Sequence, residues 1–238
     1  MNITDKLEKR RLYLYLAISF GIAWATYLVI YLTGGLVDSP MIFPNANVSL
    51  ALILLAGPVM SAPAIAHLLT RIITREGWHD ACLRPRPAHN WRYWAIAWLA
   101  PGILTLAGMA LFFWLFPRYY DPSLSTLRQM IEESAPSAMN MAETNIWYLI
   151  GAQIFQAILI SPVLNSLATF GEEFGWRAYL QPKLMPRGRR RAYLLTGVIW
   201  GIWHWPAIAM GHNYGFGYPG APFTGILMMI WFCITLGI

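Results

Sequence analysis

Six long apolar segments dominate this chain of 238 residues. A helix that crosses the hydrocarbon core of a bilayer needs about 20 mainly apolar residues, and each segment meets or approaches that length. The sequence therefore predicts an all-α fold, a polytopic transmembrane helix bundle of about six spans, formed by residues 1–238 as a single integral-membrane domain. The six segments cover roughly residues 12–33, 48–70, 93–116, 146–170, 192–210 and 223–238.

Composition supports a membrane protein. Hydrophobic residues make up 57% of the chain and charged residues only 12%, whereas a soluble domain carries about 25% charged residues. The twelve Trp and twelve Tyr fit a protein with two membrane–water interfaces, where such rings collect. The net charge of +6 does not indicate nucleic-acid binding, because the basic residues flank the apolar segments.

The distribution of Lys and Arg predicts the orientation. The N-terminal tail, the 71–92 loop and the 183–191 loop hold fourteen of the seventeen basic residues, and the loops near 34–47 and 211–222 hold none. Cytoplasmic loops carry an excess of Lys and Arg, so we expect a multi-pass protein of the cell membrane with a cytoplasmic N-terminus.

Three local features refine this outline. Pro162 is expected to kink or divide the fourth span. The polar 117–145 loop is expected to hold a short amphipathic helix around residues 125–133. The apolar run from Phe223 has sixteen residues, which is short for a span, so the last helix is expected to be truncated.

Two adjacent acids, Glu172 and Glu173, stand in the apolar sequence FGEEFGWR of residues 170–177. Acids in or near lipid are costly unless they are paired or functional. Glu173 and Arg177 are four residues apart and meet on one helix face, whereas Glu172 is turned by about 100°. We therefore expect Arg177 to hold Glu173, and Glu172 to face a cavity as a general base. The alternative is that all three cap the cytoplasmic end of a helix.

His204 is the second candidate, in the sequence WGIWHWP of residues 200–206. A neutral imidazole can orient a water or polarise a carbonyl, although a His among aromatic residues is often a packing residue. Simple counting places Glu172 near the cytoplasmic side and His204 further out, so a tilted or broken helix would have to bring them together. His212 and Asn213 are interpreted as loop structure, and His67 as a weaker candidate.

With these residues, the chain resembles the CAAX-protease and bacteriocin-processing family (CPBP, or Abi) of intramembrane peptidases. The Glu-Glu-x-x-x-Arg motif of that family matches Glu172, Glu173 and Arg177, and its aromatic-x-x-x-His motif matches Trp200 and His204. The resemblance covers about residues 145–238. It implies a bacterial inner membrane protein that hydrolyses a peptide bond in a membrane-associated protein or peptide, with lipidated CAAX-like proteins as one substrate class.

The resemblance also implies roles for the motif residues. Glu172 and His204 would activate a water, and Glu173 with Arg177 would support the motif. No cofactor is expected; if the enzyme uses zinc, Glu172, Glu173 and His204 are the ligands to consider, although no His-Glu-x-x-His pattern is present. A late His-x-x-x-Asn motif, which would form the oxyanion hole, has no match in this sequence.

Two other functions stay open. The chain could be a non-catalytic member of the same family, acting in bacteriocin self-immunity or as a membrane scaffold. It could also be a transporter or proton relay that uses Glu172 and Glu173 as carrier sites, although the sequence shows no paired repeats. Among these, an intramembrane endopeptidase with a glutamate-activated water is our prediction.

Overall fold

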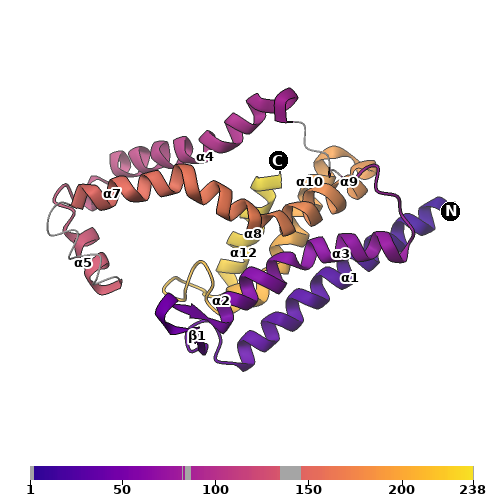
Figure 1. Ribbon diagram of the computed structural model, residues 1–238, viewed down its shortest axis with the longest axis horizontal. Coiled ribbons are helices and arrows are strands. Elements are labelled where there is room, and N and C mark those ends of the chain that lie inside the picture. Colours follow the sequence, from indigo (N-terminus) through magenta and orange to yellow (C-terminus); the bar gives the residue numbers. More distant parts are fainter. Residues whose placement is uncertain (1–2, 82, 84–86, 135–145, 238) are drawn as a thin grey trace. The chain divides into compact units, whose positions relative to one another are not determined.

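The computed structural model describes residues 3–81, 83, 87–134 and 146–237. The chain divides into two compact units, one of residues 1–83 and 167–238 and the other of residues 84–166. We call the first the motif unit, because it holds Glu172 and His204. Both units are built mainly of helices, as the sequence predicts (Figure 1). The assignment of one integral-membrane domain stays a prediction.

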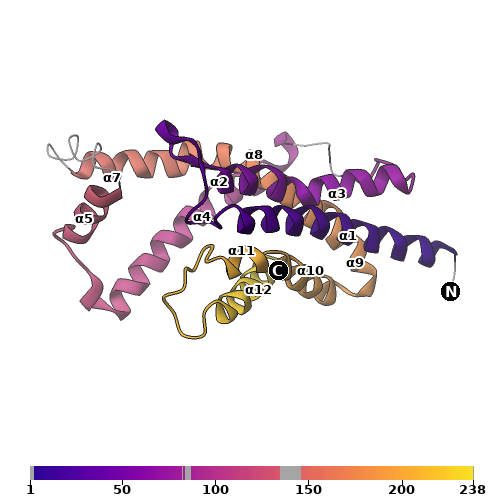
Figure 2. The ribbon, with the colours of Figure 1, turned by 90° about the horizontal axis from the view of Figure 1, so that it is seen from below.

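The motif unit combines an N-terminal and a C-terminal group of helices. In the N-terminal group α1 lies along α3 (Figure 1), and in the C-terminal group α10 lies along α12 (Figure 2). The N-terminal elements are α1 (Ile3–Leu32), the antiparallel strands β1 (Met41–Phe43) and β2 (Val48–Ser49), α2 (Leu50–Leu54), the π-helical segment η2 (Leu55–Val59) and α3 (Met60–Ile73). The C-terminal elements are the end of α8 (Ser161–Gly175), the π-helical segment η5 (Trp176–Leu180), α9 (Gln181–Leu184), the 3-10 turn η6 (Met185–Arg187), α10 (Arg189–Trp203), α11 (Trp205–Ala209) and α12 (Phe223–Gly237).

The 84–166 unit holds the third apolar segment and the first half of the fourth. Its elements are α4 (Pro87–Leu115), the turn η3 (Pro117–Tyr119), α5 (Ser125–Ser134), α7 (Ile146–Phe155), the π-helical segment η4 (Gln156–Ile160) and the start of α8. Helix α5 is the short helix expected in the polar loop. Asp121 precedes it and accepts hydrogen bonds from the Thr126 N–H at 3.1 Å and the Ser125 hydroxyl at 2.7 Å, which satisfies donors at the helix start.

Among the described residues, four helices are long and apolar enough to cross a membrane. They confirm the first four expected segments, with bounds of Lys6–Leu32, Leu50–Ile73, His89–Leu115 and Ile146–Arg187. The fifth expected segment is broken into two helices, since α10 ends at Trp203 and α11 begins at Trp205. The break lies next to Pro206, which has no N–H to continue the helical hydrogen bonds. The apolar part of α12 is also shorter than a full span, at Phe223–Thr235.

Pro162 changes the fourth span without ending it. Proline cannot donate to the carbonyl four residues earlier, which here belongs to Ile158. The segment just before Pro162 widens into the π-helix η4, and the indole N–H of Trp98 donates to the Ile158 carbonyl at 2.8 Å. A side chain from α4 thus satisfies the carbonyl that proline leaves free, as membrane helices with proline require.

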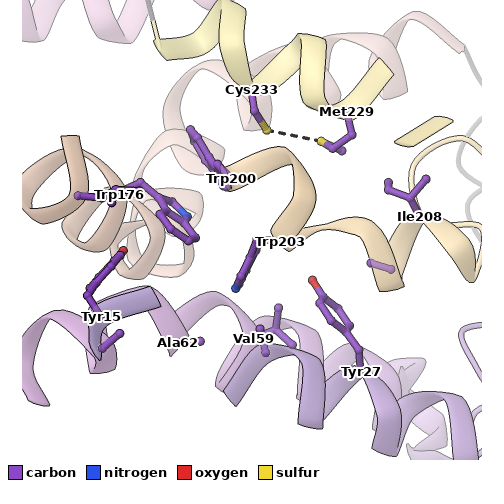
Figure 3. Packing of buried hydrophobic residues seen from close by; sticks show 14 of the residues in the cluster. Tyr15, Tyr27, Val59, Ala62, Trp176, Trp200, Trp203, Ile208, Met229 and Cys233 are labelled. Carbon is purple, nitrogen blue, oxygen red and sulfur yellow. Dashed lines mark hydrogen bonds between the residues drawn. The ribbon is translucent and has the colours of Figure 1, made fainter. Parts of the chain in front are cut away.

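Aromatic side chains fill the core of the motif unit (Figure 3). Trp176 and Trp203 are fully buried and meet edge to face, with ring centroids 5.7 Å apart. Tyr15 of α1 meets Trp176 in the same way at 5.8 Å. Edge-to-face pairs contribute about 0.5–1.5 kcal/mol beyond their buried area, so α1, η5 and α10 are held together here.

Two pairs of glycines let helices approach closely on either side of this core. Gly171 and Gly175 of α8 lie against the backbone of Met60 and against Pro63, and a Cβ at either glycine would overlap those atoms. Gly197 and Gly201 of α10 lie in the same way against the backbones of Ile234 and Ile230 in α12. Helices in lipid associate through such close packing, because lipid tails are as apolar as side chains.

Charged residues from three segments meet at one end of the motif unit. The Lys183 ammonium bonds Glu8 of α1 at 2.8 Å and also bonds Glu76, and the Arg11 guanidinium lies 3.5 Å from the Glu76 carboxylate. The start of α1, the loop after α3 and α9 therefore share one face, as their basic residues indicate. That this face is cytoplasmic stays a prediction.

Arg71 forms a second ion pair at this end. Its side chain is buried, and Nη1 donates to Asp80 Oδ1 at 2.8 Å. Partial burial raises the pKa of the Asp80 carboxyl, but the hydrogen bond and the positive charge of Arg71 outweigh it, so the pKa lies below its usual range. A lowered folded-state pKa contributes stability above the unfolded-state value, and that stability is lost as the pH falls through the folded-state pKa.

We therefore expect Asp80→Asn to lower the free energy of unfolding by about 1 kcal/mol at neutral pH, since the Asp80 side chain is half exposed and solvent weakens the pair. The difference from the wild type should shrink as the pH falls below about 4, the ordinary pKa of Asp, and should disappear only below the lowered folded-state pKa, where the wild-type carboxyl is protonated. Thermal unfolding of both proteins between pH 7 and pH 3 measures this. A constant difference across that range would show that the pair with Arg71 does not stabilise the fold.

Candidate functional site

A helical hairpin brings the two sequence motifs to the same level. The fourth span runs through α8, η5, α9 and η6 as far as Arg187, and α10 begins at Arg189. Gly188 makes the turn with a φ of 100°, a backbone conformation that glycine adopts without strain. Glu172 and His204 lie equally far from this turn, sixteen residues on either side, so antiparallel helices place them side by side.

This arrangement corrects the depth assigned to Glu172 from the sequence. The expected fourth span ended near residue 170, which put Glu172 at the cytoplasmic end of a helix. The helix instead continues to Arg187, and Glu172 lies about four turns before its end. The residues after 170 include charged side chains and Pro182, which favour the end of an apolar span, but their polar groups are paired within the motif unit.

Glu172 is buried against α10. Its side chain lies inside the motif unit with a residue exposure of 8%, and the indole N–H of Trp200 donates to Oε2 at 2.6 Å. A short hydrogen bond to a carboxylate is about twice as strong as one between neutral groups. Trp200 therefore fixes the carboxylate of Glu172, a contact that gives the first residue of the aromatic-x-x-x-His motif a physical role.

His204 follows one turn after Trp200 and faces the same carboxylate. Its Nδ1 lies 3.0 Å from the Trp200 carbonyl oxygen; since a carbonyl only accepts hydrogen bonds, Nδ1 carries the proton. In a neutral ring Nε2 then has a free lone pair. Nε2 lies 4.0 Å from Glu172 Oε2, so two acceptor atoms face each other across a gap wider than a direct hydrogen bond.

Glu173 and Arg177 form the expected pair on a different face of the helix. Arg177 Nη1 donates to Glu173 Oε2 at 2.5 Å, and both side chains are partly exposed. The Arg177 guanidinium also lies 5.5 Å from the centroid of the Trp200 ring, within the range of a cation–π contact. Arg177 thus contacts both Glu173 and the indole that binds Glu172.

A cavity of about 260 Å³ opens at this site. One wall is polar and carries Glu172, His204 and Asn213, and the other is apolar and comes from α12. The complete lining consists of Thr169, Glu172, Glu173, Trp200, His204, Asn213, Met229, Phe232 and Cys233. The sequence interpretation treated Asn213 as loop structure and assigned no role to the α12 residues. The sequence offers only a carboxamide in a Gly-rich loop as a signal for Asn213; in the structure this residue has a φ of 64°.

Two of the three zinc ligands considered from the sequence, Glu172 and His204, lie near each other. Among the described residues, no three His, Cys, Asp or Glu side chains are grouped so that they could hold a metal. Of the three ligands considered from the sequence, Glu173 is bound by Arg177, and only Glu172 and His204 approach each other. Zinc in proteins requires at least three protein ligands at about 2.0–2.3 Å.

His67, the weaker candidate, lies outside this cavity. Its ring is fully buried in α3, and its Nδ1 lies 2.9 Å from the Phe174 carbonyl oxygen. It therefore contacts the backbone of the motif helix and does not line the site.

Comparison with known protein families gives a match. Residues 151–238 match a family model described as Rce1-like, type II CAAX prenyl endopeptidase Rce1-like, and this segment includes both sequence motifs. No curated protein and no solved structure matches the chain. Residues 151–238 thus carry the sequence pattern of the Rce1-like type II CAAX prenyl endopeptidases, which is consistent with an intramembrane peptidase of the CAAX-protease and bacteriocin-processing family.

Proposed function

We propose that this chain is an intramembrane endopeptidase in which Glu172 and His204 activate a water for attack on a peptide bond. The observation that carries the proposal is the 4.0 Å separation of Glu172 Oε2 and His204 Nε2 on the wall of a cavity. The match of residues 151–238 to a family of prenyl endopeptidases supports the same reaction class.

The spacing of the two acceptors suits one water molecule. A water that donates one hydrogen to each atom at about 2.8 Å would have an angle of about 90° at its oxygen, near its natural geometry. Both hydrogens would then point at the protein, and the oxygen lone pairs would point into the cavity. His204 can act in this way because its Nδ1 proton is directed to the Trp200 carbonyl.

The reaction follows from this placement. Glu172 takes a proton from the water, the water oxygen bonds to the scissile carbonyl carbon, and the carbonyl electron pair moves to its oxygen. The protonated Glu172 then delivers the proton to the amide nitrogen, and the C–N bond breaks to give a carboxylic acid and an amine. The Asn213 amide on the cavity wall is the candidate donor to the oxyanion.

Trp200, Glu173 and Arg177 would support this step without taking part in it. The Trp200 N–H holds Glu172 in one position, and Arg177 contacts the Trp200 ring while bound to Glu173. Holding the reacting groups within a fraction of an ångström is worth several kcal/mol of the barrier. The Glu173–Arg177 pair would therefore keep Trp200 in place, and Trp200 would keep Glu172 in place.

The substrate class follows from the setting of the site. A membrane-associated protein or peptide is the proposed substrate, because Glu172 lies on a helix that is long and apolar enough to cross a membrane and the second wall of the cavity is apolar. A lipidated CAAX-like protein is the first class to test, as the description of the matching family names CAAX prenyl endopeptidases.

The experiment that tests the proposal is cleavage by the purified protein in lipid vesicles. Prenylated CAAX peptides and a library of membrane peptides are supplied together, and products are identified by mass spectrometry. A defined cleavage site supports the endopeptidase. If no peptide is cleaved, the endopeptidase proposal fails, and a non-catalytic role as an immunity or scaffold protein takes its place.

His204→Gln is expected to lower kcat by about 10²-fold, because a displacement of the reacting water by about 1 Å can cost this much and glutamine offers no imidazole lone pair to hold the water. The KM value should change little, since the cavity keeps its shape. Steady-state cleavage of the best peptide measures both constants. The matched control is His89→Gln at an exposed position of α4, and equal rates for the two variants would contradict the role of His204.

Chelators are expected to leave cleavage unchanged, because the proposed reaction depends on Glu172 and His204 and the grouping of residues does not fit zinc. The rate is measured before and after incubation with a zinc chelator. Loss of activity that added zinc restores would show that the enzyme needs a metal.

A further inference from the structure

We propose that His67 of α3 is a positioning residue for the Glu172 site, acting through the backbone of the motif helix. The inference rests on the proposed function and extends it to a helix outside the segment that matches the family model. His67 is fully buried and takes no part in the proposed reaction.

The contact is a hydrogen bond to the motif itself. His67 Nδ1 lies 2.9 Å from the carbonyl oxygen of Phe174, the residue directly after Glu173. Since the carbonyl is an acceptor, Nδ1 donates. This bond fixes the helix backbone two residues beyond Glu172.

Arg71 sets the direction of that bond. One turn further along α3, Arg71 Nε donates to His67 Nε2 at 2.6 Å, so Nε2 has no proton and Nδ1 has one. The Arg71 charge is paired in turn with Asp80. Second-layer partners of this kind fix the tautomer and the ring orientation of a functional histidine.

Ring contacts hold the imidazole on both faces. The centroid of the His67 ring lies 4.3 Å from that of Phe174 and 4.5 Å from that of Tyr179. These two residues stand on either side of Arg177 in the chain. His67 therefore packs against the end of α8 and against the π-helical segment η5, which carries the motif arginine.

The same helix fixes the register of α8 at two further points. Gly171 lies against Met60 and Gly175 against Pro63, so α3 contacts the motif helix from just before Glu172 to beyond Arg177. The glycines set the distance between the helices, and the His67 hydrogen bond is the directional contact. A displacement of 1 Å at a catalytic group can reduce a rate by about 10²-fold.

The test uses His67→Phe, which keeps an aromatic ring between Phe174 and Tyr179 but removes both nitrogen atoms. We expect kcat to fall about 10- to 100-fold with KM within about twofold. His67→Asn places an amide N–H near the position of Nδ1 and should recover most of kcat. His89→Phe, an exposed substitution in α4, is the matched control.

A second measurement does not depend on cleavage. The carboxyl stretching band of Glu172 is identified by infrared difference spectroscopy as the band that Glu172→Gln removes. We expect this band to shift in His67→Phe and to return in His67→Asn. If the wild type cleaves no peptide, the proposed function fails, and the infrared band alone decides the role of His67.

An unchanged kcat and an unchanged Glu172 band in a folded His67→Phe protein would overturn the inference. If His67→Phe does not fold, Arg71→Lys replaces it, because lysine can pair with Asp80 but has no Nε–H in the arginine position. An about 5- to 10-fold loss in kcat with constant KM is then expected, and wild-type kcat in Arg71→Lys would overturn the inference.

Discussion

Glu172→Gln is expected to lower kcat by about 10²–10⁴-fold, which is the usual contribution of a general base. Glutamine has nearly the same size, and its carbonyl oxygen can still accept the Trp200 N–H bond that holds Glu172 at 2.6 Å. The substitution removes the basic oxygen that takes the proton from water. Because substrate contacts are kept, KM should stay within about threefold, and steady-state cleavage in vesicles measures both constants.

Substitutions at two further acids, Glu173 and Asp38, serve as comparisons for Glu172→Gln. Glu173→Gln weakens the ion pair with Arg177 and is expected to lower kcat about 10-fold, since Glu173 acts through Arg177 and Trp200. Asp38→Asn, at an exposed loop position, should leave both constants unchanged. If Glu173→Gln lost more activity than Glu172→Gln, the roles of the two acids would have to be exchanged.

Gly175→Ala is expected to destabilise the protein by about 1–3 kcal/mol, the usual cost of overpacking. The added Cβ would overlap the ring and backbone of Pro63 in α3, so α8 and α3 would have to separate. The separation would displace Glu172, and kcat should fall by about 10²-fold. The midpoint of thermal unfolding and the cleavage rate of the folded fraction measure the two effects.

Gly21→Ala is the matched control for this prediction. Gly21 also lies in a helix, but a Cβ there meets no atom within 4 Å. Alanine favours helix over glycine by about 1 kcal/mol, so Gly21→Ala should keep or raise stability. If Gly175→Ala behaved in the same way, close packing of α8 on α3 would not be required for the site.

Much of the fold could be predicted from the sequence. The first four apolar segments appear as long helices at nearly the expected positions, because spanning a bilayer leaves a strong signal in composition. The pair of Glu173 and Arg177 could also be predicted, since helical spacing alone brings side chains four residues apart together.

The position of Glu172 along the fourth helix could not be predicted, because the expected end of that helix, near residue 170, lies well before its observed end at Arg187. The residues after 170 have charged side chains and Pro182, which favour the end of an apolar span. They stay helical because tertiary contacts pair these groups: Lys183 with Glu8, and the Tyr179 hydroxyl with Glu76 at 2.9 Å. Such pairs join residues more than 100 positions apart in the chain, which local sequence patterns do not show.

The roles of Asn213 and His67 were hidden for a similar reason. Asn213 lines the cavity because the loop after α11 brings it next to residues that are distant in the sequence, such as Glu172. His67 contacts the motif helix because small residues let α3 approach it. The sequence shows the glycines of both close helix contacts, but it does not show which residues they pack against.

The central claim is that Glu172 activates water for peptide-bond hydrolysis, and cleavage in heavy-oxygen water tests it most directly. Wild-type protein and Glu172→Gln are incubated in matched vesicles with the cleaved peptide, and the new C-terminal carboxylate is analysed by mass spectrometry. We expect the wild type to incorporate one heavy oxygen atom per cleavage, and Glu172→Gln to yield almost no product. Labelled product from Glu172→Gln at the wild-type rate would contradict the claim.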